Sequence, residues 1–180
     1  MRIIKENSIA VIIDVQDRLF PHIYENIALE RNLGIFVKGL KILDIPIIVT
    51  EQYSKGLGYT IPSIKSILPE YQAIEKTCFS CCDEQVFRKS LLDSGKKYVI
   101  IAGIESHVCV MQTVNDLIEI GLQPVVIEDC VSSRNLNDKK ISIKRMQQEG
   151  AIISTYESIL FELCRISGTD KFKEISKLVK

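Results

Sequence analysis

Residues 98–110 read Tyr98-Val-Ile-Ile-Ala-Gly-Ile-Glu-Ser-His-Val-Cys-Val110, and this stretch decides the fold. Its apolar first half is typical of a buried strand, Gly103 marks a tight turn, and the second half begins a helical pattern. This unit places Cys109 at the carboxyl end of a strand, where open α/β sheets carry their chemistry. Unpaired N–H groups and the helix dipole in a first helical turn would favour its thiolate. A small buried hydrophobe is the alternative interpretation of the same cysteine.

The alternation of short β-rich runs and longer helical patterns continues along the whole chain. We predict strands at 8–14, 45–50, 72–76, 97–103, 123–128 and 151–155. We predict helices at 27–43, 83–92, 106–120, 137–148, 157–164 and 170–179. The strands are rich in Val and Ile with little alternation, which suits a sheet covered on both faces. The sequence thus predicts an α/β fold: a three-layer α/β/α sandwich with a mostly parallel six-stranded sheet of Rossmann-like topology, in a single domain over 1–180.

Composition limits the partners and the compartment. The chain has 180 residues, with 23 lysines and arginines balanced by 23 aspartates and glutamates. Because no basic surface is indicated, we expect neither a nucleic acid nor a membrane as partner. No apolar run approaches the roughly 20 residues that span a bilayer, and charges interrupt the start before any signal-like stretch. We therefore expect a cytoplasmic protein whose six cysteines are reduced.

Three residues that can carry chemistry occupy equivalent places in the pattern. Asp14 closes the first predicted strand, Lys76 closes the third, and Cys109 follows the fourth. The carboxyl ends of parallel strands meet at one edge of a sheet, so an acid, a cation and a thiol are expected there together. Taken alone, each residue also has a non-catalytic interpretation. These are a helix N-cap for Asp14, an exposed side chain for Lys76 and a core thiol for Cys109.

The chain resembles the isochorismatase-like cysteine hydrolases, a family that includes nicotinamidases and N-carbamoylsarcosine amidases. The matching motifs, in chain order, are Ile12-Ile-Asp-Val-Gln16, Glu75-Lys-Thr-Cys-Phe-Ser80, Gly103-Ile-Glu-Ser-His-Val-Cys-Val110 and Val126-Ile-Glu-Asp-Cys-Val-Ser-Ser-Arg134. Two further stretches, Glu51-Gln-Tyr-Ser-Lys-Gly-Leu-Gly58 and the tail around Leu160-Phe-Glu-Leu163, look most like the branch of isochorismatase domain-containing proteins.

The resemblance implies a role for each matched residue. Asp14 corresponds to the catalytic aspartate, Lys76 to the lysine and Cys109 to the nucleophile. The resemblance also implies a cis peptide between Ile104 and Glu105, which would direct the backbone N–H groups of Glu105 and Cys109 at an oxyanion. The implied enzyme hydrolyses a small amide- or carbamate-type substrate at its C–N bond, through a thioester and without a cofactor. It would be a homo-oligomer, a dimer or larger.

A pocket and a metal site receive weaker support. The segment 51–62 is expected to be the longest structureless connection and a pocket wall. Gln16, Phe20, Tyr53 and Phe79 are candidates for a small substrate pocket, with core packing an equal alternative for Phe79. Cys78, Cys81 and Cys82 lie close together, but a structural zinc site needs four ligands, so no metal is expected. His107 is interpreted as structural or pocket-lining, because residues two apart on a helix face different directions.

Three rival functions follow from the same residues. A nicotinamidase is one, yet its metal-binding histidines have no counterpart near 51–53, since the chain's two histidines are His22 and His107. A non-catalytic binding or scaffold relative of the same fold is the second. A nucleotide or flavin protein is the third, but it would need a glycine-rich turn after the first strand.

Overall fold

The computed structural model describes residues 2–180, and its six strands form one sheet. All neighbouring strands run parallel, in the order β3-β2-β1-β4-β5-β6. The strands are β1 (Ser8–Ile13), β2 (Ile47–Gln52), β3 (Ile74–Lys76), β4 (Tyr98–Ile104), β5 (Gln123–Ser132) and β6 (Ile152–Ser154). The predicted three-layer α/β fold is confirmed, with a sheet that is parallel throughout.

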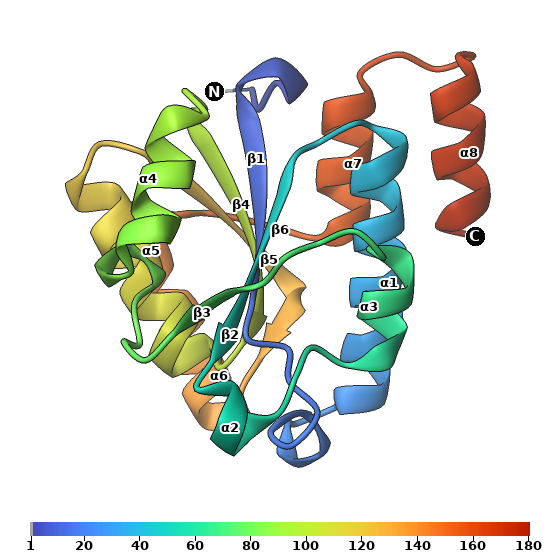
Figure 1. Ribbon diagram of the computed structural model, residues 1–180. Helices are drawn as coiled ribbons and strands as arrows, with labels where there is room; N and C mark the ends of the chain where they lie inside the picture. Colours follow the sequence, from blue (N-terminus) through green and yellow to red (C-terminus); the bar gives the residue numbers. More distant parts are fainter. Residues whose placement is uncertain (1) are drawn as a thin grey trace.

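Helices cover both faces of the sheet, as Figure 1 shows. One face packs against α1 (Asn26–Ile42), α3 (Pro62–Ile67), α7 (Tyr156–Cys164) and α8 (Asp170–Leu178). The other packs against α4 (Gln85–Asp93), α5 (Met111–Glu119) and α6 (Leu136–Glu149). Short turns complete the chain: α2 (Ser54–Leu57), the 3₁₀ turns η1 (Lys5–Asn7), η2 (Phe20–His22) and η3 (Cys81–Asp83), and the π-helical turn η4 (Ser106–Val110). No helix in the described part of the chain is long and apolar enough to cross a membrane.

The central strands are buried on both faces, which explains why their sequences do not alternate. In β1, Ala10 and Ile12 pack into the core beneath α1, whereas Val11 and Ile13 pack into the core beneath α4 and α5. A strand with two buried faces needs apolar residues at every position. The uninterrupted apolar run of β1 therefore specifies its central place in the sheet.

Two local predictions are wrong. The segment 51–62 is not structureless: its first two residues belong to β2, α2 follows, and Pro62 is the first residue of α3, where its fixed φ suits a helix start. Strand β5 continues four residues beyond the predicted end at 128. Its pairing with β4 shifts register between Ile101 and Gly103, and this irregularity accommodates the charged pair Glu128 and Asp129 within the strand.

The strand order reverses direction between β1 and β4, and the carboxyl ends of these two strands lie on either side of that point. Gly103 allows them to approach closely. It has φ +127°, and a Cβ built there would lie 2.1 Å from the carbonyl oxygen of Ile13. Only glycine fits this contact, because the obstructing atoms belong to the backbone. In open α/β sheets such a switch point is where ligands bind.

Replacing Gly103 by alanine is expected to destabilise the protein by at least about 3 kcal/mol, because the new methyl group meets immovable backbone. Urea denaturation measures this loss. Gly95→Ala is the matched control: Gly95 also has a positive φ, +64°, but no atom lies within 4 Å of the point that a Cβ would occupy there. The control should cost only about 1–2 kcal/mol, the strain of the left-handed backbone. Equal losses in the two variants would contradict the close contact.

Candidate active site

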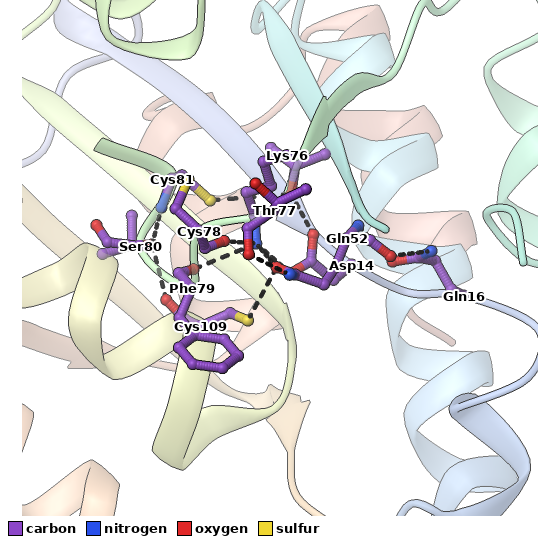
Figure 2. A network of polar contacts seen from close by, with 12 residues as sticks. Asp14, Gln16, Gln52, Lys76, Thr77, Cys78, Phe79, Ser80, Cys81 and Cys109 are labelled. Carbon is purple, nitrogen blue, oxygen red and sulfur yellow. Dashed lines mark hydrogen bonds and ion pairs between the residues drawn. The ribbon is translucent and has the colours of Figure 1, made fainter. Parts of the chain in front are cut away.

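Four polar side chains converge at the carboxyl edge of the sheet, and Figure 2 shows them from close by. Lys76 and Gln52 are the last residues of β3 and β2 and are paired across those strands. Asp14 directly follows β1, and its N–H donates to the carbonyl of Thr50 at 3.2 Å. Cys109 lies in η4, which is separated from the end of β4 by Glu105 alone. The structure thus brings Asp14, Lys76 and Cys109 together, with Gln52 among them.

Asp14 and Lys76 form a buried ion pair. Lys76 Nζ lies 2.6 Å from Asp14 Oδ2, and the two side chains are 0 % and 2 % exposed. The other carboxylate oxygen accepts a hydrogen bond from Thr50 Oγ1 at 2.7 Å. Burial is the largest single effect on the pKa of Lys76 and lowers it, but the charge and hydrogen bond of Asp14, together with the nearby Cys81 and Cys109, raise the pKa overall. Lys76 is therefore a fixed cation, and Asp14 is held beside it with a φ of +52°, a backbone conformation that Asp tolerates.

The ammonium of Lys76 has three further acceptors besides Asp14. It donates to Gln52 Oε1 at 2.7 Å and to the carbonyl oxygens of Cys78 and Phe79, each at 3.2 Å. With Asp14 Oδ2 the ammonium has four acceptors, so its three N–H groups are all used and at least one of them is shared. The lysine side chain crosses the end of β2 to reach Asp14, because β2 lies between β1 and β3.

Cys109 is a buried thiol, 6 % exposed, whose Sγ lies 4.0 Å from Gln52 Oε1. Burial raises its pKa well above the ordinary value, and the charge of Asp14 raises it further, while Lys76 lowers it. The sequence-based expectation that the helix start favours the thiolate is therefore corrected: η4 continues directly into α5, so Cys109 does lie in a first helical turn, but desolvation dominates its pKa. At rest the sulfur carries its proton, so attack requires a base.

The backbone before Cys109 is fixed from two sides. The peptide bond between Ile104 and Glu105, which the resemblance places in the cis form, is cis in the structure. The carbonyl of Glu105 accepts from the N–H groups of Val108 and Val110 at 3.1 and 3.2 Å. Its carboxylate accepts from the N–H and the Nε of Arg134 at 2.9 and 3.2 Å. These bonds hold the segment that leads from β4 into η4.

A family comparison accounts for this arrangement. The model of the isochorismatase domain matches residues 8–158. The chain belongs to the isochorismatase family. Mouse isochorismatase domain-containing protein 2A is 36 % identical over 184 residues, which cover 99 % of this chain and 85 % of the mouse protein. The sequence-based recognition of the family is confirmed.

Solved structures agree with this assignment. MAR1 ribonuclease from Caenorhabditis elegans superimposes with a TM-score of 0.93 at 40 % identity, covering 99 % of this chain and 92 % of the other. The YcaC gene product of Escherichia coli, described as an octameric hydrolase of unknown specificity, also has a TM-score of 0.93. It is 26 % identical, with 99 % of this chain and 89 % of that chain covered. The isochorismatase-family assignment thus indicates a hydrolase without naming its substrate.

The four predicted pocket residues of this family member fall into two groups. Gln16 is buried, and its amide donates to the carbonyls of Gln52 and Gly58 at 3.0 and 2.7 Å and accepts from the N–H of Gln52 at 2.7 Å. Phe20 is buried in the core beneath α1. Gln16 therefore fixes the end of β2 through hydrogen bonds to Gln52, and Phe20 packs in the hydrophobic core. Tyr53 and Phe79 are more than half exposed, and their pocket role stays a prediction.

Glu51 lies in the stretch that corresponds to the metal-binding segment of nicotinamidases, but its carboxylate accepts hydrogen bonds from within the protein. Glu51 Oε1 accepts from the N–H and the Oγ1 of Thr60, both at 2.8 Å. Within residues 2–180, no three His, Cys, Asp or Glu side chains are grouped so that they could hold a metal ion. Cys81 and Cys82 are buried free thiols, and burial raises the pKa of each to about 12.

Gln52 is the site residue that sequence reasoning missed. It lies in a segment that invites comparison with the metal-binding stretch of nicotinamidases, where its amide suggests no role. The available signal is positional: Gln52 follows the apolar run Ile47-Ile-Val-Thr50 at the same edge as the three predicted residues. In this family member it contacts both Lys76 and Cys109.

Proposed function

We propose that the protein is a cysteine hydrolase that cleaves the C–N bond of a small amide- or carbamate-type substrate through a thioester on Cys109. The observation that carries the proposal is a buried Cys109 thiol at the edge of the sheet where Asp14 and Lys76 form a buried ion pair, and burial raises the pKa of this thiol. A thiol in that state needs a base within reach, and Asp14 is the base.

The first half of the reaction forms the thioester. Asp14 takes the proton from Cys109 as the sulfur attacks the substrate carbonyl carbon. The backbone N–H groups of Glu105 and Cys109 hold the resulting oxyanion. The protonated Asp14 then gives its proton to the departing nitrogen, the C–N bond breaks, and the amine or ammonia leaves.

The second half regenerates the thiol. Water attacks the thioester carbonyl and gives a proton to Asp14, and the acid departs as the C–S bond breaks. The sulfur recovers the proton from Asp14. Lys76 stays charged throughout, so the proton moves between two groups beside a constant positive charge, and the net charge of the buried site does not change. This constancy favours catalysis in a place where desolvation penalises any new charge.

The relatives support the class of reaction and an assembly. The Escherichia coli protein is described as an octameric hydrolase, which supports a homo-oligomer for this chain as well. The Caenorhabditis elegans protein is described as a ribonuclease, so RNA belongs in any substrate test. We propose a small carbonyl compound because a buried thiol with an adjacent base suits acyl transfer.

A substrate screen read by intact-protein mass spectrometry tests the function. Wild-type protein and Cys109→Ala are incubated with small amides, ureas, carbamates and, separately, RNA. The expected result is an acyl adduct that forms on wild type, is absent in the variant, and disappears as product accumulates.

Three other outcomes would contradict or change this proposal. Binding of compounds with neither adduct nor turnover would indicate the non-catalytic relative. Nicotinamide turnover that depends on Cys109 would restore the nicotinamidase alternative. Cleavage of RNA by wild type and by Cys109→Ala alike would remove the thiol from the mechanism.

A further inference from the structure

The orientation of the Gln52 side chain is determined by its neighbours. Its Nε2 donates to the carbonyl of Thr77 at 2.8 Å, and its Oε1 accepts from Lys76 Nζ at 2.7 Å. A carbonyl can only accept and an ammonium can only donate, so the reverse orientation of the amide would lose both hydrogen bonds. The amide oxygen therefore faces Lys76, with Cys109 Sγ 4.0 Å away from it.

The main chain of Gln52 is held as firmly as its side chain. Gln16 acts like a neighbouring strand: its Oε1 accepts from the Gln52 N–H at 2.7 Å, and its Nε2 donates to the Gln52 carbonyl at 3.0 Å. On its other side Gln52 pairs with Lys76 in the sheet. A side chain fixed at both ends can position its neighbours without losing much conformational entropy at each turnover.

The uncharged side chain of Gln52 matters because charged groups surround the sulfur of Cys109. The groups that face Cys109 are Asp14 from the end of β1, Lys76 from β3, Cys81 from η3 and the neutral Gln52 from β2. One carboxylate and one ammonium balance each other there. A second carboxylate at position 52 would oppose the negative charge that develops on sulfur, whereas an amide oxygen satisfies Lys76 without adding charge.

We propose that Gln52 is a positioning residue: its neutral amide oxygen holds the Lys76 ammonium against Asp14 and limits the negative charge beside Cys109 to one carboxylate. The inference rests on the proposed function, in which Cys109 becomes a thiolate during attack. It assigns to the end of β2 a role in the acidity of the thiol, exerted through Lys76 and not through the substrate.

The test is the pH dependence of Cys109 alkylation by iodoacetamide, followed on the Cys109 peptide by mass spectrometry. Wild type is compared with Gln52→Glu, Gln52→Met and Gln72→Glu. Gln72 is exposed and precedes β3 at the opposite edge of the sheet, so its variant adds the same charge far from the sulfur. Circular dichroism verifies that each variant is folded.

In Gln52→Glu the midpoint of the alkylation profile should move upward by at least about one pH unit, a tenfold loss of thiolate at a given pH. In Gln52→Met the midpoint should move downward, because Lys76 loses one acceptor, keeps its charge and stabilises the thiolate more strongly. Gln72→Glu should match wild type. An unchanged or upward-shifted midpoint in Gln52→Met, or no shift in Gln52→Glu, would overturn the proposal.

The same measurement remains decisive in two difficult cases. If Gln52→Glu does not fold, Gln52→Met decides alone, since an unchanged or upward-shifted midpoint there contradicts the proposal. If the substrate screen finds no adduct on wild type, the proposed hydrolase function fails, yet alkylation needs no turnover and still decides the role of Gln52.

Discussion

Asp14→Asn is expected to have two opposite effects: turnover falls by about 10²–10⁴-fold, the contribution of a general base, while Cys109 is alkylated faster than in wild type. Turnover is measured with the substrate that the screen identifies, and alkylation with iodoacetamide on the Cys109 peptide. The alkylation assay reports the acidity of the Cys109 thiol, and the turnover assay reports catalysis by it.

Both effects have the same physical origin. The carboxylate of Asp14 raises the pKa of Cys109 through its charge and through a hydrogen bond. Asparagine removes the charge, leaves Lys76 to stabilise the thiolate, and so increases the thiolate fraction. The variant then has a better nucleophile but no group that gives a proton to the leaving nitrogen or takes one from water. Asparagine also tolerates the left-handed backbone at this position, so the fold should persist.

Asp17→Asn is the matched control, since Asp17 is exposed and lies three residues further along the chain. It should leave both assays unchanged. Normal turnover in Asp14→Asn would remove the aspartate from the mechanism. Slower alkylation in Asp14→Asn would show that its charge does not raise the pKa of the thiol.

The sheet could be predicted from the sequence because its signal is strong and local. Continuous runs such as Ala10-Val-Ile-Ile13 leave few alternatives to a strand buried on both faces. The misassigned parts depend on tertiary context. Residues 51–62 look like a loop because of Gly56, Gly58 and Pro62, yet α2 forms within this segment and α3 begins at Pro62, with Ile64 buried in the core beside α1. The charged Glu128 and Asp129 suggest a strand end, which only the irregular pairing with β4 overrides.

The candidate site was predictable in its location but not in its electrostatics. Strand ends alone place Asp14, Lys76 and Cys109 at one edge, since parallel strands share that edge. The sequence does not give the strand order, and it is the order that puts β2, and therefore Gln52, between Asp14 and Lys76. Nor does it give the depth of burial of Cys109, which decides that desolvation outweighs the helix dipole.

Lys76→Met is expected to destabilise the protein by about 3–5 kcal/mol, the usual cost of leaving one charge of a buried pair without its partner. In this variant the carboxylate of Asp14 keeps two uncharged side-chain donors, the Thr50 hydroxyl and the Cys109 thiol. Asp14→Asn should cost less, because Lys76 keeps Gln52 Oε1 and two carbonyl oxygens as acceptors. The free energy of unfolding in urea measures each loss.

The double variant Asp14→Asn/Lys76→Met decides whether the pair acts as a unit. Two neutral side chains leave no uncompensated charge, so the double variant should be more stable than Lys76→Met alone, although it contains one more substitution. Costs that simply add would mean that the 2.6 Å contact contributes no coupling. In that case Lys76 would serve packing only, and its constant positive charge could not be what allows the proton to move between Cys109 and Asp14.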